Sequence, residues 1–264
     1  MWRKHLARAF RRWQGIALVV AALVPTVWLA ITNQLILYIH PRYVVFTVIM
    51  AALGLALVIA SFVTAPHGDH DHDHDHDHDD REPRAGRTGA LMSTGATVLT
   101  LIVAAGLVVV PPATLTSATA DQRVINSTSV GAGTQTIGGA TSAPAGAFAK
   151  FTVLDWSSLL RQTTDASFYA GKAVDVVGFI TKDSEDPADV FYVSRFVITC
   201  CAVDAQPVGV PVYLPNWQNS FKVNEWVRVT GSFDSNPSSR STQSIALLPT
   251  KTTPVDQPSD PYLY

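Results

Sequence analysis

The stretch VFYVSRFVITCC, residues 190–201, decides the fold class of the C-terminal half of this chain. Its residues are mostly β-branched and aromatic, and clusters of Asp, Gly and Pro flank it, which is typical of a short strand. Five such strands in about 100 residues predict a small, mainly-β barrel of the OB type over residues 150–250, and a small sandwich is the alternative. The other four stretches are KAVDVVGFIT (172–181), VGVPVYL (208–214), EWVRVTGSFD (225–234) and SIALLPT (244–250).

The segments on either side of these strands are predicted to be simple. DWSSLLRQT (155–163) predicts one short helix, with Asp155 as its N-cap and Trp156 on its apolar face. Residues 116–149 are mostly Ser, Thr, Ala and Gly without a hydrophobic period, so we expect a flexible linker. Residues 251–264 are rich in Pro and predict an extended tail.

Three uncharged apolar runs precede residue 116, at 15–39, 43–65 and 88–115. Each covers the roughly 20 apolar residues that cross the hydrocarbon core of a bilayer. We therefore expect a membrane region over residues 1–115 with three transmembrane helices. A cleaved signal peptide is the alternative for the first run, because its basic start fits one. Against it, the run is longer than a typical signal core, and a second apolar run follows directly.

Basic residues in the short loops predict the orientation, since cytoplasmic loops carry an excess of Lys and Arg. Five basic residues precede the first run and three lie in the loop 66–87, whereas the turn between the first two runs carries only Arg42. We expect a multi-pass protein of the cell membrane. Its N-terminus and the loop 66–87 would be cytoplasmic, and its C-terminal domain extracytoplasmic.

That loop contains HGDHDHDHDHDHDD, residues 67–80. Neutral imidazole and carboxylate are ligands for zinc and other borderline divalent ions. Because the alternation implies no fold, we expect zinc or another divalent metal to be loosely bound rather than held in a defined tetrahedral site. A solvated low-complexity spacer and an acid-sensing loop are the alternatives. The candidate ligands are His67, His70, His72, His74, His76 and His78 with Asp69, Asp71, Asp73, Asp75 and Asp77.

Cys200 and Cys201 are the two cysteines of the chain, and they are adjacent. Across a trans peptide their Cα atoms lie about 3.8 Å apart, below the usual disulfide range of about 4.4–6.8 Å. A disulfide between them would therefore be strained and easily reduced. Two thiolates could instead bind a soft metal with Asp204 nearby, or the two small side chains could only pack. Arg195, in the same strand, could pair with Asp204 or with a partner, or lie at the rim.

Several catalytic arrangements are missing from the sequence. No histidine follows His78, so the outer domain contains no Cys–His or Ser–His–Asp set. The chain has no P-loop and no dinucleotide-binding fingerprint. The net charge of −2, without a basic stripe, argues against a nucleic-acid partner. We therefore expect a protein that is not an enzyme.

Five motifs occur together: HPR (40–42), DW (155–156), GKAVDVVGFI (171–180), EWVRVTG (225–231) and, most specifically, SRFVITCCAVDAQPVGVPV (194–212). In these motifs the chain resembles the YcgQ-like family of bacterial membrane proteins. The resemblance implies one subunit of a two-component permease, whose partner is a separate multi-spanning permease subunit. It also implies a link to metal homeostasis.

The prediction is thus a non-enzymatic integral membrane subunit of a permease, in contact with the lipid bilayer and with the permease subunit. Its His/Asp loop would collect or sense divalent metal. The alternative is a membrane-anchored thiol-redox or sensing module in which Cys200 and Cys201 are the active pair. A third interpretation is a binding module without metal, since OB-type barrels bind ligands on one face.

Overall fold

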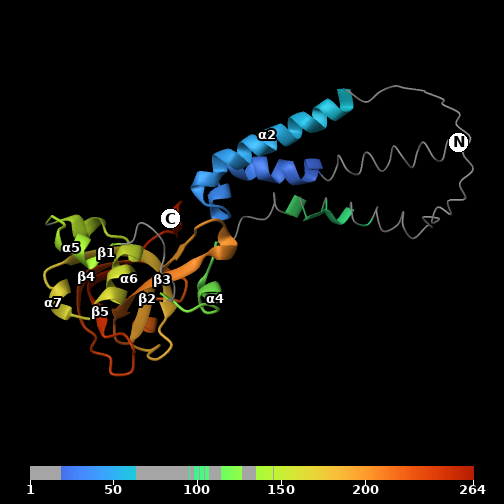
Figure 1. Ribbon diagram of the computed structural model, residues 1–264. Helices are drawn as coiled ribbons and strands as arrows, with labels where there is room; N and C mark the ends of the chain where they lie inside the picture. Colours follow the sequence, from blue (N-terminus) through green and yellow to red (C-terminus); the bar gives the residue numbers. More distant parts are fainter. Residues whose placement is uncertain are drawn as a thin grey trace, which may run out of the picture. The chain divides into compact units, whose positions relative to one another are not determined.

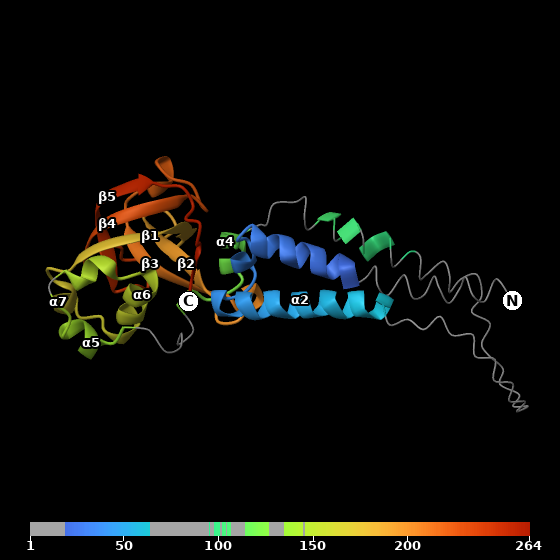
Figure 2. The same ribbon diagram turned by 90° about the horizontal axis from the view of Figure 1, so that it is seen from above.

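The computed structural model describes residues 19–63, 95, 98–100, 102–103, 105–106, 114–126, 135–144 and 146–264. The chain divides into two compact units, which are drawn in Figures 1 and 2. The first unit is Met1–Ile36 with Pro41–Pro112, and the second is Leu37–His40 with Ala113–Tyr264. The second unit therefore includes four residues from the connection between two helices of the first.

Apolar helices build the first unit. A helix covers Val19–Ile31, and α2 covers Pro41–Val63. The two helices approach closely at Gly54, where an added Cβ atom would lie 3.6 Å from the side chain of Leu23. Small residues at such contacts are typical of helices that pack in a membrane.

One helix among the described residues is long and apolar enough to span a bilayer. It is Pro41–Ala60, with a mean hydropathy of 2.6 and most of its large side chains exposed. The first predicted span is too long at its C-terminal end, because the helix ends at Ile31 and Asn33 takes the left-handed conformation, φ 56°, that ends many helices. The described residues thus support one spanning helix, not the three that we expected.

A six-stranded sheet forms most of the second unit (Figure 1). The strand order is β1-β4-β5-β3-β2-β6, and β1 also pairs with β2. β3 pairs with β5 in parallel, β2 pairs with β6 in parallel, and the other pairs are antiparallel. The five predicted strands are confirmed, and β6 is an additional short strand. Their bounds are β1 (Ala173–Lys182), β2 (Val190–Val197), β3 (Gln206–Tyr213), β4 (Trp226–Ser235), β5 (Ile245–Pro254) and β6 (Tyr262–Leu263).

Glycine allows β1 to reach both of its neighbours. β1 pairs with β4 over its N-terminal seven residues and with β2 from Phe179 onward. At Gly178, just before this change of partner, an added Cβ atom would lie 2.5 Å from the carbonyl oxygen of Ser194. A side chain at Gly178 would therefore separate β1 from β2.

The helix α6 (Val153–Gln162) packs against β1, β2 and β3 (Figure 1). Trp156 is fully buried, and its ring centroid lies 5.1 Å from that of Phe233. The predicted helix is confirmed, but Asp155 is not its N-cap. Thr152 is the N-cap, and Asp155 occupies the third helical position, where the two residues form a reciprocal capping box.

The region predicted as a linker, residues 116–149, folds onto the domain where it is described. It contains α4 (Ser117–Ala120), α5 (Ile137–Thr141) and η2 (Ala147–Lys150). Ala120 and Ala140 are each 1% exposed. The expectation of a flexible linker is wrong for these residues, and so is that of a single short helix, since α7 (Ala166–Tyr169) is present as well. Composition does not reveal this packing, because alanine is common both in linkers and in buried contacts.

Asn126 fastens this region to β3. Its side-chain amide donates to the carbonyl of Gly209 over 2.8 Å and accepts from the Gly209 N–H over 2.9 Å. Asn126 has a positive φ of 62°, which asparagine tolerates better than most residues. The Asn126 side-chain amide thus makes the two hydrogen bonds to the Gly209 backbone that a neighbouring strand would otherwise make.

The predicted tail, residues 251–264, also belongs to the domain. β5 continues to Pro254, and Tyr262 in β6 is 3% exposed. Tyr262 belongs to a small hydrophobic cluster, separate from the main core, that we call the tether cluster. It includes Leu37, which precedes α2, and Leu115, which ends the third apolar run. Its members are Ala120, Phe179, Phe196, Ile198, Ala205 and Tyr262, with Leu37, Leu115 and Trp226 packed against them.

Candidate functional site

The two cysteines lie in the loop between β2 and β3, which we call the double-cysteine loop (residues 199–204). Both are thiols in this structure, with Cys200 exposed and Cys201 half-buried. Cys201 has an extended backbone, φ −153° and ψ 170°, and η3 (Ala202–Asp204) follows it. The pair therefore lies where a strand ends and the chain turns, with one thiol open to solvent.

Asp204 holds this loop in shape. Its carboxylate accepts from the Cys200 N–H over 2.7 Å and from the Thr199 N–H over 3.2 Å. The Asp204 N–H donates to the carbonyl of Cys201 over 3.0 Å. Because each carboxylate oxygen accepts a backbone N–H, Asp204 acts here as a local turn-former.

A second chain segment completes the loop. The N–H of His40 donates to the carbonyl of Cys200 over 3.0 Å, and the N–H of Ala202 donates to the carbonyl of Tyr38 over 2.8 Å. Ile39 and Cys201 thus form an antiparallel bridge. The ring of His40 also lies edge-on to that of Tyr264, with centroids 4.8 Å apart. The sequence did not predict this arrangement, because 160 positions separate residues 40 and 200.

Arg195 binds the C-terminal tail rather than Asp204. Its guanidinium donates to the carbonyls of Asp260 and Pro261, each over 2.8 Å, and more weakly to that of Tyr262. It also lies over the ring of Trp226, 5.2 Å from the ring centroid, which is within the range of a cation–π interaction. Burial lowers the pKa of Arg195, while the nearby Asp260 and Tyr264 oppose that shift. Of the alternatives considered for Arg195, pairing with Asp204 is thus replaced by bonds to the tail carbonyls.

No metal site emerges from the described ranges. Within them, no three His, Cys, Asp or Glu side chains are grouped as metal ligands would be. The soft-metal interpretation of Cys200, Cys201 and Asp204 therefore gains no support. The His/Asp ligands at 67–78 lie outside the described residues, so their metal binding stays a prediction.

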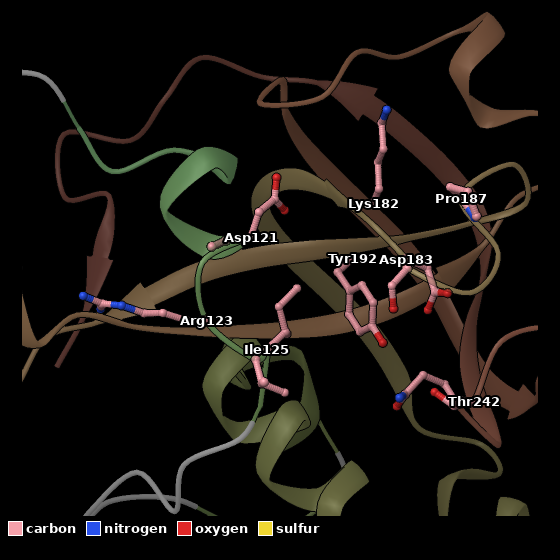
Figure 3. A pocket seen from close by; sticks show the side chains of 12 residues that line it. Asp121, Arg123, Ile125, Lys182, Asp183, Pro187, Tyr192 and Thr242 are labelled. Carbon is pink, nitrogen blue, oxygen red and sulfur yellow. The ribbon is translucent and has the colours of Figure 1, made fainter.

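A cleft of about 710 Å³ lies elsewhere on the C-terminal domain (Figure 3). Its walls come from the segment after α4, the hairpin between β1 and β2, and the residues before β5. Tyr192 and Asp183 lie side by side in it, whereas the side chain of Arg123 extends away from them (Figure 3). The lining mixes apolar and charged groups: Ala120, Asp121, Arg123, Val124, Ile125, Lys182, Asp183, Ser184, Pro187, Tyr192, Thr242 and Gln243.

Two buried aspartates lie in the β1–β2 hairpin, which forms one wall of this cleft. Asp183 is 2% exposed and accepts from the N–H groups of Glu185 and Asp186 over 2.8 and 2.7 Å. Asp186 is equally buried and pairs with Arg240 over 2.6 Å. Burial raises the pKa of Tyr192, and the adjacent Asp183 carboxylate raises it further. Sequence reasoning missed these residues, although the four acids of DSEDPAD (183–189) were a visible signal.

Two family models match the chain. The model of the DUF1980 N-terminal domain matches residues 14–126, and that of the DUF1980 C-terminal domain matches residues 152–264. The chain carries both DUF1980 domains. The resemblance to the YcgQ-like family is thereby confirmed. The double-cysteine loop and β1–β6 lie within the DUF1980 C-terminal domain, and α2 and α4 within the N-terminal one. Comparison with curated proteins found no match.

Proposed function

We propose that this DUF1980 protein is a non-enzymatic, membrane-anchored subunit of a two-component permease. The observation that supports this proposal most is the tether cluster, in which Leu37 and Leu115 pack against one side of the outer domain. Leu37 lies just before the apolar helix α2, and Leu115 ends the third apolar run. A domain held by two such segments is suited to stand on a membrane and to meet a membrane partner.

We infer that the outer domain is a closed, OB-like barrel. The pairings β1–β4, β4–β5, β5–β3, β3–β2 and β2–β1 return to the starting strand, and the parallel β3–β5 pair agrees with a Greek-key arrangement. The cleft beside the β1–β2 hairpin is our candidate place for a ligand or a permease segment, because barrels of this type bind on the face that such loops border.

The cytosolic loop supplies the proposed link to metal. We propose that the alternating histidines and aspartates of residues 67–80 bind zinc or another divalent ion loosely and at high capacity. Protons should compete with the metal as the pH falls, because ligand imidazoles must be neutral. Three membrane spans with a cytoplasmic N-terminus remain part of this proposal.

Purification of the full chain from native membranes in mild detergent tests the permease assignment. We expect a multi-spanning protein to co-purify in a fixed ratio. As a matched control, the loop 67–80 is replaced by Gly and Ser, which should abolish zinc binding in a titration but leave the co-purification unchanged. A chain that purifies alone from cross-linked native membranes contradicts the assignment, and equal zinc binding by both forms contradicts the metal role.

A thiol-redox module is the second candidate function. The observation that favours it is the exposed thiol of Cys200 next to the half-buried thiol of Cys201. Oxidation would form the Sγ–Sγ bond and pass two electrons and two protons to an external thiol–disulfide partner. Peptide mass spectrometry after mild oxidation should then show a loss of two hydrogen atoms confined to residues 200–201. Two thiols that remain fully alkylatable after oxidation contradict this candidate.

A further inference from the structure

The double-cysteine loop is bound to the residue that precedes the spanning helix. The carbonyl of Cys200 accepts from the N–H of His40 over 3.0 Å. His40 is followed directly by Pro41, the first residue of the apolar stretch Pro41–Ala60. Since consecutive Cα atoms are about 3.8 Å apart, this hydrogen bond keeps the loop within a few residue lengths of the start of that helix.

A second attachment lies at the same part of the domain. The loop leaves β2 through Ile198 and enters β3 through Ala205, and both are buried in the tether cluster. Leu115 packs in that cluster, and its N–H donates to the Tyr262 hydroxyl over 3.2 Å. The double-cysteine loop thus projects from the place where both chain segments that adjoin the apolar runs are held.

The tip of the loop has the chemistry of a lipid-facing surface. Val203 is 82% exposed, and Val124 is 73% exposed. Arg123, which directly precedes Val124, donates to the carbonyl of Val203 over 3.0 Å. An apolar side chain beside a cation suits the headgroup layer, where the first meets acyl carbons and the second meets phosphate. The first turn of α2 carries Arg42 and Tyr43, which are residue types that favour the same layer.

From these observations we propose that the double-cysteine loop is the membrane-facing tip of the outer domain and that Val203 enters the headgroup layer of the bilayer. This inference rests on the membrane anchoring proposed above. It places Cys200 at the lipid surface, where its thiol meets reagents that partition into membranes before those that remain in water.

Lipid quenching of a fluorophore tests the proposal on the full chain. In a C200S/C201S background, the single-cysteine variant Val203→Cys is labelled with an environment-sensitive dye and reconstituted into vesicles of phosphatidylcholine and phosphatidylglycerol. The matched control is Ala188→Cys, which is exposed in the β1–β2 hairpin at the opposite end of β2. The eight residues of β2 separate these labels by about 25 Å.

We expect spin-labelled lipid to quench the dye at position 203 several-fold more than the dye at position 188. A blue-shifted emission should accompany the quenching. Weak and equal quenching at both positions, in protein that resists alkaline extraction from the vesicles, overturns the lipid contact but leaves the anchoring intact. Protein that alkaline extraction releases overturns the anchoring itself. Dye at position 203 that only a co-reconstituted permease shields identifies a protein contact and overturns the lipid assignment.

Discussion

The backbone N–H of His40 donates to the carbonyl of Cys200 over 3.0 Å, and so joins two positions that lie far apart in the sequence. The contact ties the double-cysteine loop, which lies in the DUF1980 C-terminal domain, to the residue before α2.

Removing the Asp204 carboxylate should loosen the double-cysteine loop. Asp204→Ala leaves the N–H groups of Thr199 and Cys200 without their acceptor, at a cost of about 1–3 kcal/mol in the free energy of unfolding. Cys200 should then react faster with a maleimide, measured by peptide mass spectrometry on the full chain in detergent. Asp204→Asn keeps one acceptor oxygen, so its Cys200 labelling rate should lie between those of the wild type and Asp204→Ala. An unchanged labelling rate in Asp204→Ala contradicts the role given to Asp204.

Loss of the Arg195 guanidinium should release the C-terminal tail. Arg195→Ala removes donors to three tail carbonyls, and we expect a loss of about 2–4 kcal/mol, with faster proteolysis after Pro254. Arg195→Lys keeps the charge but not the planar fork, so it should restore stability only in part.

Arg228→Ala is the matched control for Arg195, because the Arg228–Asp175 ion pair is exposed on both sides. Such a surface pair contributes at most about 1 kcal/mol. Thermal unfolding, followed by tryptophan emission, measures the loss of stability in Arg195→Ala and in Arg228→Ala. Equal losses in the two alanine variants would show that Arg195 has no special hold on the tail.

A methyl group at Gly178 should weaken the β1–β2 pairing. The added Cβ would lie 2.5 Å from the Ser194 carbonyl oxygen, a distance that forces the strands apart. We expect Gly178→Ala to lower the unfolding free energy by about 1–3 kcal/mol and to speed amide exchange in Phe179–Lys182. Gly138→Ala is the control, because no atom lies within 4 Å of its added Cβ. If the amides of Phe179–Lys182 still exchange slowly in Gly178→Ala, the β1–β2 pairing does not depend on this glycine.

Alkaline pH should destabilise the domain through Tyr192. Its pKa is raised in the folded state, chiefly by burial and also by Asp183, so the folded chain keeps the phenol proton longer than the unfolded chain does. Stability is therefore fully present below the ordinary tyrosine pKa of 10.0 and falls as the pH rises above it. Tyr192→Phe should flatten this fall in thermal unfolding between pH 9 and about pH 11. A wild-type stability that stays constant across that range would contradict the argument.

Local sequence determined the strands and one helix. Short runs of β-branched and aromatic residues, separated by clusters of Gly, Pro and Asp, predicted the five main strands. The same reasoning found α6, yet it assigned its cap to Asp155 rather than Thr152. Both residues take part in a capping box, and composition cannot show which of them begins the helix.

Local sequence failed where small side chains pack at a distance. Ala120 and Ala140 are buried in a region whose composition is that of a flexible linker, because their contacts are with strands far along the chain. The long first apolar run, 15–39, likewise hid Leu37–Ile39, which belong to the C-terminal unit. Hydropathy averages over such a short segment and cannot separate it from the helix before it.

What the sequence determined by itself was therefore the set of strands, the long apolar helix and the position of two adjacent cysteines. Only the tertiary structure decided which groups bond around those cysteines. The Asp204 carboxylate accepts from the Cys200 N–H, the Arg195 guanidinium donates to the tail carbonyls, and the His40 N–H donates to the carbonyl of Cys200. The physical reason is that propensity and hydropathy depend on neighbours along the chain, whereas hydrogen bonds between distant segments form only once the sheet has brought them together.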